Sequence, residues 1–456
     1  MYSPQNQLTS GIGRDVWIGE YGSRDIGLDA LNNSDIRYLR TLASENKLTV
    51  IEKPGLVTID TSSWVGVVRL STKDIHIQPK DPIVTACLPT LLALAYSPIN
   101  LRWLAGRPRF SAERQLSVTD LLALLLSNAT DEVARKGLLS DYTGQEEWVG
   151  QIRGRIVFNE FIRHRQSRPA QVPCRFEEFE LNNPANQVLA LTLRTAAAWA
   201  QDTDVRRAVL RSAGLFSEVS DPSAESIETF RWKRSYHRQN QHYKDAHDLA
   251  FAILDGLEIS AFEQSKLPRG DLPGQSFLVD MNKVFERFVW RLVERLFSSS
   301  NYQVDYQTGE KRELPGVDRL DNVGEHLRVR GRPDIMLTVG GLHPRSLPID
   351  AKYKLYGGGG GHPADIYQAL FYAISFGDAE PSLRRAVLIH PAAPGTAVRI
   401  AHIQYLKSDH ANVTLIGLDV RGACSELLST PGTTLSSLKE VLEKALLAGP
   451  TPAPVN

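Results

Sequence analysis

The sequence contains few cysteines and no excess of either charge. Its 456 residues include 3 cysteines, Cys87, Cys174 and Cys424, which form neither a CxxC pair nor a disulfide framework. A small secreted scaffold stapled by disulfides is therefore excluded, and a reducing cytoplasm is the expected location. The 52 basic residues equal the 52 acidic residues, so the chain is not a histone-like polycation, although local basic patches could still bind nucleic acid.

The sequence also lacks the features of export and of membrane insertion. The first residues contain no basic stretch followed by an apolar one, so we expect no signal peptide. Residues 82–101 carry no charge and are long enough to span a bilayer, but they include three prolines and several polar side chains. This composition predicts a buried helix at about residues 88–96 and no membrane contact.

The length predicts about three domains, and a hydrophobic content of 42% is enough for substantial cores. Short β-branched runs that end in a hairpin predict a small β domain over residues 1–82. Residues 83–270 predict a mainly helical middle region that contains one strand with a glycine bend. Residues 271–448 alternate strands and helices, and the Pro-containing tail at 449–456 is expected to be disordered. The expected fold class is therefore multidomain α+β with a C-terminal α/β domain.

The strongest functional pattern is Pro-Asp334 followed by Asp350-Ala-Lys352. Both segments are predicted strands, and the turn that connects them begins with two glycines. Side chains alternate between the two faces of a strand, so Asp350 and Lys352 are expected to point the same way. Pairing of the two strands can bring Asp334 beside Asp350.

Two carboxylates and an ammonium group on one patch are unfavourable for stability alone, because like charges repel and burial of charge is costly. A divalent cation removes this conflict, and Mg²⁺ prefers hard oxygen ligands such as Asp334 and Asp350. Lys352 could then orient a water, assist its deprotonation, or offset charge on a pentavalent phosphate. The pattern favours Mg²⁺-dependent phosphodiester hydrolysis with these three residues as catalytic groups. The alternative is a surface hairpin whose charges are solvated.

Two predicted helices contribute further candidate residues. Glu286 lies at the edge of the apolar stripe of a helix at residues 281–298, where it could be a further metal ligand or an ordinary surface glutamate. In a helix at residues 364–376, Gln368 and Tyr372 share one face. We expect Gln368 to be catalytic, because an amide on an otherwise apolar helix needs partners. Tyr372 is expected to contact DNA. The alternative is a buried helix with Tyr372 in the core.

Basic side chains indicate two places for DNA. The segment from Arg231 to Lys244 contains five Lys/Arg residues, interleaved aromatic residues and no acid, which suits phosphate binding and base stacking. The alternatives are a solvated surface or a face for an acidic protein. The candidate DNA contacts, in this segment and beside the predicted catalytic strands, are Arg231, Lys233, Arg234, Arg330, Arg332 and Lys354.

The chain contains no GxxxxGK[ST] motif, so it is not expected to be a nucleotide-driven motor itself. Five consecutive glycines at residues 357–361 follow the second predicted strand. Such a run is too flexible to preorganise amides around a phosphate, so we expect a mobile loop over the active site.

With these residues assembled, the chain resembles the McrC family, the nuclease subunits of McrBC-type modification-dependent restriction systems. The resemblance covers about residues 14–425 and is most specific at residues 277–376, which contain the Asn282–Val289 segment and the Asp334 and Asp350–Lys352 motifs. It implies that the C-terminal domain has the restriction-endonuclease-like PD-(D/E)xK fold.

The resemblance also implies a partner and a substrate. McrC-like proteins act with McrB, an AAA+ GTPase ring, and their N-terminal β region docks on that ring and stimulates its GTPase. Residues 1–82 would then be the docking domain. The implied substrate is double-stranded DNA that carries 5-methylcytosine or a related modification, the cofactor is Mg²⁺, and the chain is expected to cut only in complex with its partner, as a defence against phage. The alternative is a non-catalytic adaptor that activates an AAA+ ring and only binds DNA.

Overall fold

The structure of the protein is a computed structural model that describes residues 15–79, 82–97, 101, 104, 116–164, 170–256, 275–299, 301–307, 312–320, 326–341, 344–356, 361–377, 380, 383–393, 399–404, 411–428 and 432–447. Its strands are β1 (Asp15–Gly19), β2 (Ser23–Gly27), β3 (Leu48–Lys53), β4 (Leu56–Thr61), β5 (Trp64–Arg69), β6 (Asp74–Gln78), β7 (Asp141–Val149), β8 (Arg155–Ile156), β9 (Val172–Glu180), β10 (Gln275–Asp280), β11 (Tyr302–Tyr306), β12 (Arg312–Leu320), β13 (His326–Gly331), β14 (Ile335–Val339), β15 (Arg345–Ala351), β16 (Arg385–Ala392), β17 (Arg399–Gln404) and β18 (Asn412–Asp419). Its helices are α1 (Asn33–Ser44), α2 (Pro82–Tyr96), α4 (Val118–Lys136), α5 (Phe158–His164), α6 (Pro184–Trp199), α7 (Thr203–Gly214), α8 (Ala224–Lys233), α9 (Lys244–Gly256), α11 (Met281–Leu296), α12 (Pro363–Phe376), α13 (Val420–Leu427) and α14 (Thr434–Leu447).

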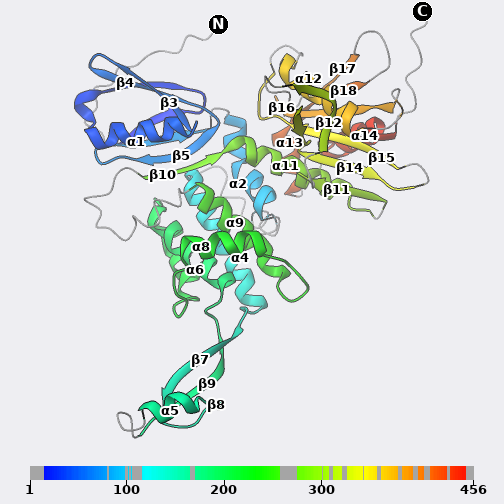
Figure 1. The fold of residues 1–456 in the computed structure, drawn as a ribbon. Coiled ribbons are helices and arrows are strands. Elements are labelled where there is room, and N and C mark those ends of the chain that lie inside the picture. The colour runs from blue at the N-terminus through cyan, green and yellow to red at the C-terminus, as the bar shows by residue number, and fades with distance from the viewer. Residues whose placement is uncertain are drawn as a thin grey trace, which may run out of the picture. The chain divides into compact units, whose positions relative to one another are not determined.

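The chain divides into two compact units, and their elements can be followed in Figure 1. One unit combines residues 1–115 with residues 264–456, and the other comprises residues 116–263. The mixed α+β, multidomain character expected from the sequence is confirmed. Among the described helices, none combines the length and the apolar character that a bilayer crossing requires.

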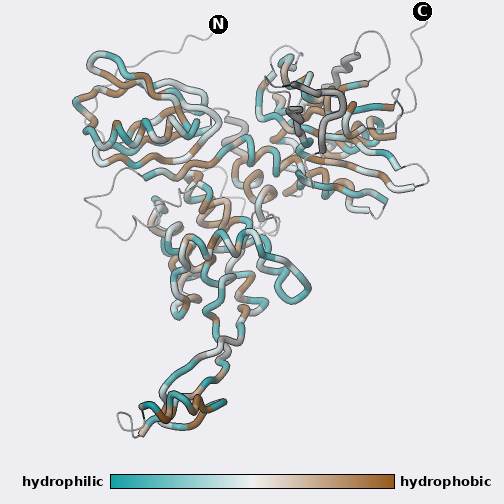
Figure 2. The backbone as a smooth tube through the Cα atoms, in the orientation of Figure 1, coloured by the Kyte–Doolittle hydropathy of each residue, from teal (hydrophilic) through white to brown (hydrophobic). Residues whose placement is uncertain are grey.

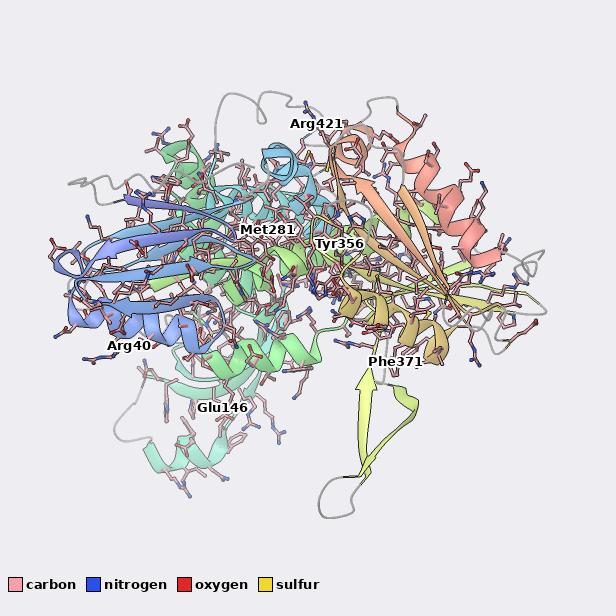
Figure 3. The ribbon with its side chains drawn as sticks, turned by 90° about the horizontal axis from the view of Figure 1, so that it is seen from above. Arg40, Glu146, Met281, Tyr356, Phe371 and Arg421 are labelled. Carbon is pink, nitrogen blue, oxygen red and sulfur yellow. The ribbon has the colours of Figure 1, made fainter. Side chains whose placement is uncertain are left out.

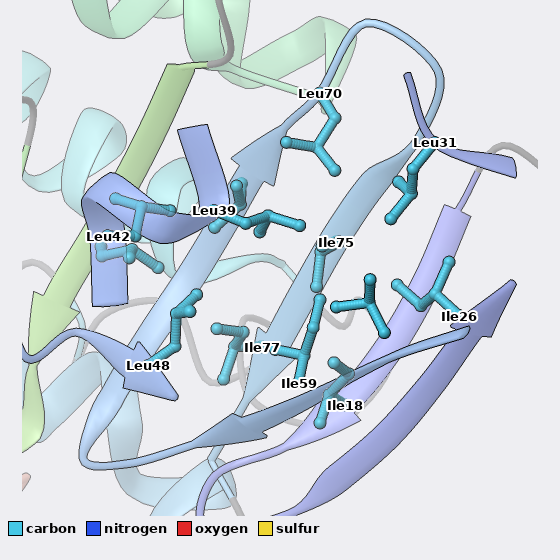
Figure 4. Close-up of a cluster of buried hydrophobic side chains, with 13 residues drawn as sticks. Ile18, Ile26, Leu31, Leu39, Leu42, Leu48, Ile59, Leu70, Ile75 and Ile77 are labelled. Carbon is cyan, nitrogen blue, oxygen red and sulfur yellow. The ribbon is translucent and has the colours of Figure 1, made fainter. Parts of the chain in front are cut away.

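Two sheets and helix α1 form the N-terminal part of the first unit. Strands β2, β4 and β3 form one sheet, and β1, β6, β5 and β10 form the other. Aliphatic side chains from both sheets and α1 form one core (Figure 4), in which Leu39, Ile59 and Ile75 have no solvent exposure. The predicted hairpin is confirmed, because β5 and β6 pair antiparallel.

The last strand of the second N-terminal sheet comes from far along the sequence. Strand β10 pairs antiparallel with β5, so that Phe277 lies opposite Val67, and its chain continues directly into α11. Gly66 permits this close pairing, because its φ is 142° and a Cβ would lie 2.0 Å from the Phe277 carbonyl oxygen. Strand β10 therefore belongs to the predicted C-terminal domain by sequence and to an N-terminal sheet by pairing.

The charge-free segment forms helix α2, as predicted, and its Leu91 and Leu92 are fully buried. Helix α2 packs against α11 and α13. This packing brings the thiols of Cys87 and Cys424 into contact, and both are free cysteines. The hydrogen bond from this contact, together with burial, raises the pKa of the Cys424 thiol well above its usual value.

Helices make up most of the second unit, where α4, α6, α7 and α9 pack around buried side chains such as Leu122, Leu189 and Ile253. Strands β7, β9 and β8 form a sheet in this unit, although the sequence predicted only one strand there. Strand β7 reads Asp-Tyr-Thr-Gly-Gln-Glu-Glu-Trp-Val, which has too few apolar positions for recognisable strand alternation. Figure 2 shows apolar residues along α5 beside this sheet, and Ile162 of α5 is 73% exposed.

A six-stranded mixed sheet organises the C-terminal part of the first unit, in the order β11-β14-β15-β16-β18-β17. Antiparallel pairs join β11 to β14 and β14 to β15, whereas β15, β16 and β18 are parallel. Helix α12 packs on one face, where Ala369 and Ala373 meet Leu388 and Val413. Strand β16 is buried over residues 385–391, so both faces of the sheet are covered, and α11 and α14 also contact it.

Candidate active site

Asp334 and Asp350 face each other across two neighbouring strands. Ile335 of β14 pairs with Ile349 of β15, so the next pair along the ladder is Asp334 with Asp350. Asp334 Oδ2 accepts a hydrogen bond of 2.8 Å from the Ala351 amide, which ties the start of one strand to the end of the other. The predicted juxtaposition of the two carboxylates is therefore confirmed.

Asp350 is buried with very little hydrogen bonding. The residue is 1% exposed, and neither carboxylate oxygen accepts a well-directed hydrogen bond from a described donor. The Nζ atom of Lys352 lies 2.9 Å from Oδ2 and forms an ion pair with it, as the predicted strand alternation requires. A buried carboxylate with unused lone pairs is costly, and a bound cation would relieve that cost.

Burial raises the pKa of both carboxylates. For Asp334, burial is the largest cause, and the charges of Asp350 and Glu286 add to it, so the pKa lies well above its usual value. For Asp350, burial raises the pKa although the nearby Lys352 opposes the increase. Burial lowers the pKa of Lys352, but the adjacent carboxylates outweigh it and raise the pKa overall, so this side chain is an ammonium group.

Glu286 reaches the same region from α11, and its carboxylate is hydrogen-bonded to Gln307. The carboxamide of Gln307 donates from Nε2 to Glu286 Oε1, and its Oε1 accepts a hydrogen bond of 2.9 Å from Arg332 Nη2. Gln307 follows β11, and its backbone N–H donates to the Asp334 carbonyl oxygen at 2.8 Å. Sequence reasoning missed Gln307, because no local signal reveals which residue of β11 lies opposite Asp334.

The donor set fits one magnesium ion bound by two carboxylates. Within the described residues, no group of three or more His, Cys, Asp or Glu side chains is arranged to hold a metal. The Glu286 carboxylate accepts a hydrogen bond from Gln307, and its role as a further metal ligand stays a prediction. Mg²⁺ commonly uses one or two protein carboxylates together with waters and substrate phosphate, and the unused acceptor positions of Asp350 match that requirement.

A further acidic residue, Asp365 of α12, lies beside this centre and is neutralised by its neighbours. Its two carboxylate oxygens accept hydrogen bonds of 3.0 and 3.1 Å from Lys354 Nζ, and Oδ2 accepts one of 2.7 Å from Tyr356, which Figure 3 labels. Burial raises the pKa of Asp365, but these bonds outweigh it and lower the pKa overall. Lys354, predicted to contact DNA, therefore already has an intramolecular partner.

Gln368 and Tyr372 lie on one face of α12, as predicted, and Gln368 Nε2 donates to the Tyr372 hydroxyl at 2.8 Å. Burial raises the pKa of Tyr372, and the charges of Asp350 and Asp334 raise it further, so this pair lies near the carboxylate centre. Tyr372 is buried and packs edge-on against Phe376. This position corresponds to the core alternative and does not present the ring to DNA.

In the basic segment of the second unit, the two arginines predicted to bind DNA have acidic partners. Arg231 forms an ion pair of 2.5 Å with Asp255, and Arg234 lies 3.8 Å from a carboxylate oxygen of Asp248. Both guanidinium groups also lie over the ring of Phe251. These acids come from α9, beyond the segment that the sequence pattern covers, and the contacts favour a structural role for both arginines.

The other predicted DNA contacts are Lys233 and Arg330. Lys233 is exposed, and Arg330 lies on β13, but the side chain of Arg330 is outside the described residues. The glycines at 357–360 and the tail at 449–456 also lie outside the described residues.

Comparisons with known proteins concern the family and the fold of the chain. A family model described as McrBC 5-methylcytosine restriction system component matches residues 59–391. No curated protein matches the chain. A solved half-complex of Thermococcus gammatolerans McrB AAA+ hexamers with bound McrC is similar with a TM-score of 0.58 and 14% identity, over 95% of this chain and 100% of that chain. A cryo-EM structure of the Thermococcus gammatolerans McrBC complex matches with a TM-score of 0.42 and 17% identity, over 66% of this chain and 90% of that chain.

Proposed function

Because this chain belongs to the family of McrBC 5-methylcytosine restriction system components, we propose that it is the subunit of such a system that hydrolyses DNA phosphodiester bonds with Mg²⁺. The observation that carries the proposal is the pairing of Asp334 with the buried Asp350, with Lys352 beside them. Two neighbouring carboxylates that share a single ammonium group, Lys352, repel each other, and a bound cation would relieve that repulsion.

Each residue of the centre then has a chemical role. Asp334 and Asp350 would hold Mg²⁺, which when bound acts as a Lewis acid and lowers the pKa of a coordinated water. Lys352 is a fixed ammonium group beside Asp350, and its positive charge can stabilise the negative charge that develops on the phosphate.

We assign residues 271–448 to a PD-(D/E)xK nuclease domain on this basis. The assignment is supported by the antiparallel β14–β15 pair that carries both carboxylates, the parallel neighbour β16, and the helix α12 that follows the catalytic strand. Gln368 on α12 is the further candidate catalytic residue. Its amide donates to the Tyr372 hydroxyl, and Tyr372 is close enough to Asp350 and Asp334 for their charges to raise its pKa.

The proposed partner is an AAA+ ring. The similar Thermococcus gammatolerans structure contains McrB AAA+ hexamers with bound McrC, and the present chain has no nucleotide-binding P-loop motif of its own. We propose that this chain binds a McrB-like GTPase through its N-terminal β region, residues 1–82, stimulates GTP hydrolysis, and cuts modified double-stranded DNA only within that complex in the cytoplasm.

A non-catalytic adaptor that only binds DNA would have no need for the carboxylate centre. A cleavage assay with the full chain, its AAA+ partner, GTP, Mg²⁺ and a 5-methylcytosine duplex separates the two functions. We expect Asp350→Asn to remove cleavage while GTPase stimulation persists. Asp419→Asn is the matched control, because Asp419 is also a buried aspartate at a strand end of the same sheet, and asparagine retains its helix-capping role. Cleavage by Asp350→Asn at the wild-type rate would exclude the proposed nuclease.

A further inference from the structure

Gln307 lies at the point where edge strand β11 meets the carboxylate centre. Tyr306 of β11 pairs with Ile335 of β14, and the next residue, Gln307, continues this ladder by donating its N–H to the Asp334 carbonyl oxygen. The backbone of Gln307 has a φ of 42°, in the left-handed region that non-glycine residues rarely adopt. Such strain persists only where the surroundings enforce it, and it is frequent at functional sites.

The carboxamide of Gln307 bridges two groups of opposite charge. A carboxylate can only accept hydrogen bonds and a guanidinium can only donate them, so Glu286 and Arg332 together determine which end of the amide faces which neighbour. Arg332 Nη1 makes a second bond of 3.2 Å to the Gln307 backbone carbonyl oxygen. Gln307 therefore holds Arg332 through two atoms, one from its side chain and one from its backbone.

The two acceptors that Arg332 contacts are both neutral atoms of Gln307, unlike the acceptors of several other described arginines. Arg231 and Arg291, for example, each form an ion pair with a carboxylate. In the described part of the chain, Arg332 lies two residues from Asp334 yet forms no ion pair, because Gln307 stands between it and Glu286. Its charge is therefore not neutralised, and a guanidinium with five N–H groups retains donors for an anionic ligand.

We infer that Gln307 is a positioning residue for the proposed nuclease reaction. It keeps Glu286 from pairing with Arg332 and holds the guanidinium, still fully charged, where it can bind the phosphate of the DNA backbone next to Asp334. The inference rests on the proposed function, because the ligand that it assigns to Arg332 is the phosphodiester of the substrate.

The experiment uses the full chain with its AAA+ partner and a 5-methylcytosine duplex, and it measures kcat and KM for cleavage. The variants are Gln307→Gly, which tolerates the positive φ, Gln307→Glu, Arg332→Ala and the double variant Gln307→Gly/Arg332→Ala. Gln303→Ala is the control, since Gln303 lies on the same strand, is exposed and bonds only to the nearby Asp305 among the described residues.

We expect Gln307→Gly and Arg332→Ala each to lower kcat/KM roughly 10- to 100-fold, because a misplaced phosphate contact costs about this much. The kcat/KM of the double variant is expected to be no lower than that of the more severe single variant, since both substitutions disrupt the same Gln307–Arg332 interaction. Gln307→Glu is expected to be worse than Gln307→Gly, because its carboxylate would neutralise Arg332. A purely structural role for Gln307 would instead give multiplicative losses and no difference between glycine and glutamate.

A second measurement separates the inference from the proposed function. DNA binding is followed with Ca²⁺ in place of Mg²⁺, and we expect Arg332→Ala and Gln307→Glu each to reduce the salt dependence by about one phosphate contact. If Asp350→Asn is inactive but Gln307→Gly cleaves like the wild type, the inference fails and the nuclease stands. If the wild type does not cleave but the salt dependence changes as expected, the nuclease fails and the phosphate contact stands. If the wild type does not cleave and the salt dependence of DNA binding does not change in the variants, both the nuclease function and the phosphate contact are overturned.

Discussion

The carboxylate centre and the basic segment at residues 231–244 were both candidate sites in the sequence, and folding treats their charges in opposite ways. At the centre, Asp350 is buried without well-directed donors and lies opposite Asp334. In the basic segment, Arg231 and Arg234 each have an acidic neighbour and share the ring of Phe251. A cluster of charges in a sequence is therefore a weak guide to a site, whereas two facing carboxylates that share a single ammonium group, Lys352, indicate a ligand.

Substitution of a centre carboxylate should produce the largest effect. We expect Asp334→Asn to reduce cleavage roughly a thousandfold or more and to raise the free energy of unfolding by about 1 kcal/mol, because it removes repulsion with the buried Asp350. Cleavage assays and urea unfolding of the same preparation test both parts. A loss of stability in place of a gain would mean that the two carboxylates are already compensated in the folded chain.

Removal of the Lys352 ammonium group should have the opposite effect on stability. Lys352→Met leaves Asp350 without its ion pair, so we expect cleavage to fall about a hundredfold or more and the free energy of unfolding to fall by about 2 kcal/mol. The double variant Asp350→Asn/Lys352→Met is expected to recover the stability and not the activity. If the double variant is as unstable as Lys352→Met alone, loss of the ion pair with Asp350 is not the cause of the lower stability.

The second unit should respond to pH through a buried histidine. In its neutral form His247 donates from Nε2 to the Ala185 carbonyl oxygen and accepts at Nδ1 from the Tyr236 hydroxyl. Burial lowers the pKa of His247 from 6.5 to about 4. Above pH 6.5 it is neutral in the folded and unfolded states, so it has no effect there. Between pH 6.5 and 4 only the unfolded state binds the proton, so we expect the free energy of unfolding to fall by about 3 kcal/mol in total.

Hydrogen exchange of α6 and α9 at pH 7 and pH 4.5 measures this loss. In His247→Gln the free energy of unfolding is expected to differ little between the two pH values. In the control His237→Gln, where the histidine is exposed, the full difference is expected to remain. An unchanged pH dependence in His247→Gln would assign the loss to another group.

The basic segment should give the smallest effect on DNA. We expect Arg231→Ala and Arg234→Ala to change the DNA affinity of the complex less than about twofold and to lower the free energy of unfolding by about 1 kcal/mol, because their contacts lie within the chain. Fluorescence anisotropy and urea unfolding provide the two values, with Arg332→Ala as the positive control for affinity. A strong loss of affinity without a loss of stability would restore the DNA interpretation of this segment.

Much of the C-terminal fold could be predicted because its signals are local. The helices expected at 281–298 and 364–376 occur as α11 (Met281–Leu296) and α12 (Pro363–Phe376), since their apolar spacing and flanking residues are sufficient to define them. Strand alternation likewise predicted that Asp350 and Lys352 share a face. In contrast, β7, β8 and β9 have weak apolar alternation, and their sheet was not predicted as such.

The sequence by itself determined the type of most C-terminal elements, the family resemblance and the pairing of Asp334 with Asp350, because these depend on neighbours within a strand or across one connection. Only the tertiary structure decided that β10 completes an N-terminal sheet, that Gln307 separates Glu286 from Arg332, and that acids of α9 lie beside Arg231 and Arg234. Each of these joins segments whose register is set by packing of the whole unit, and no local spacing in the sequence encodes that register.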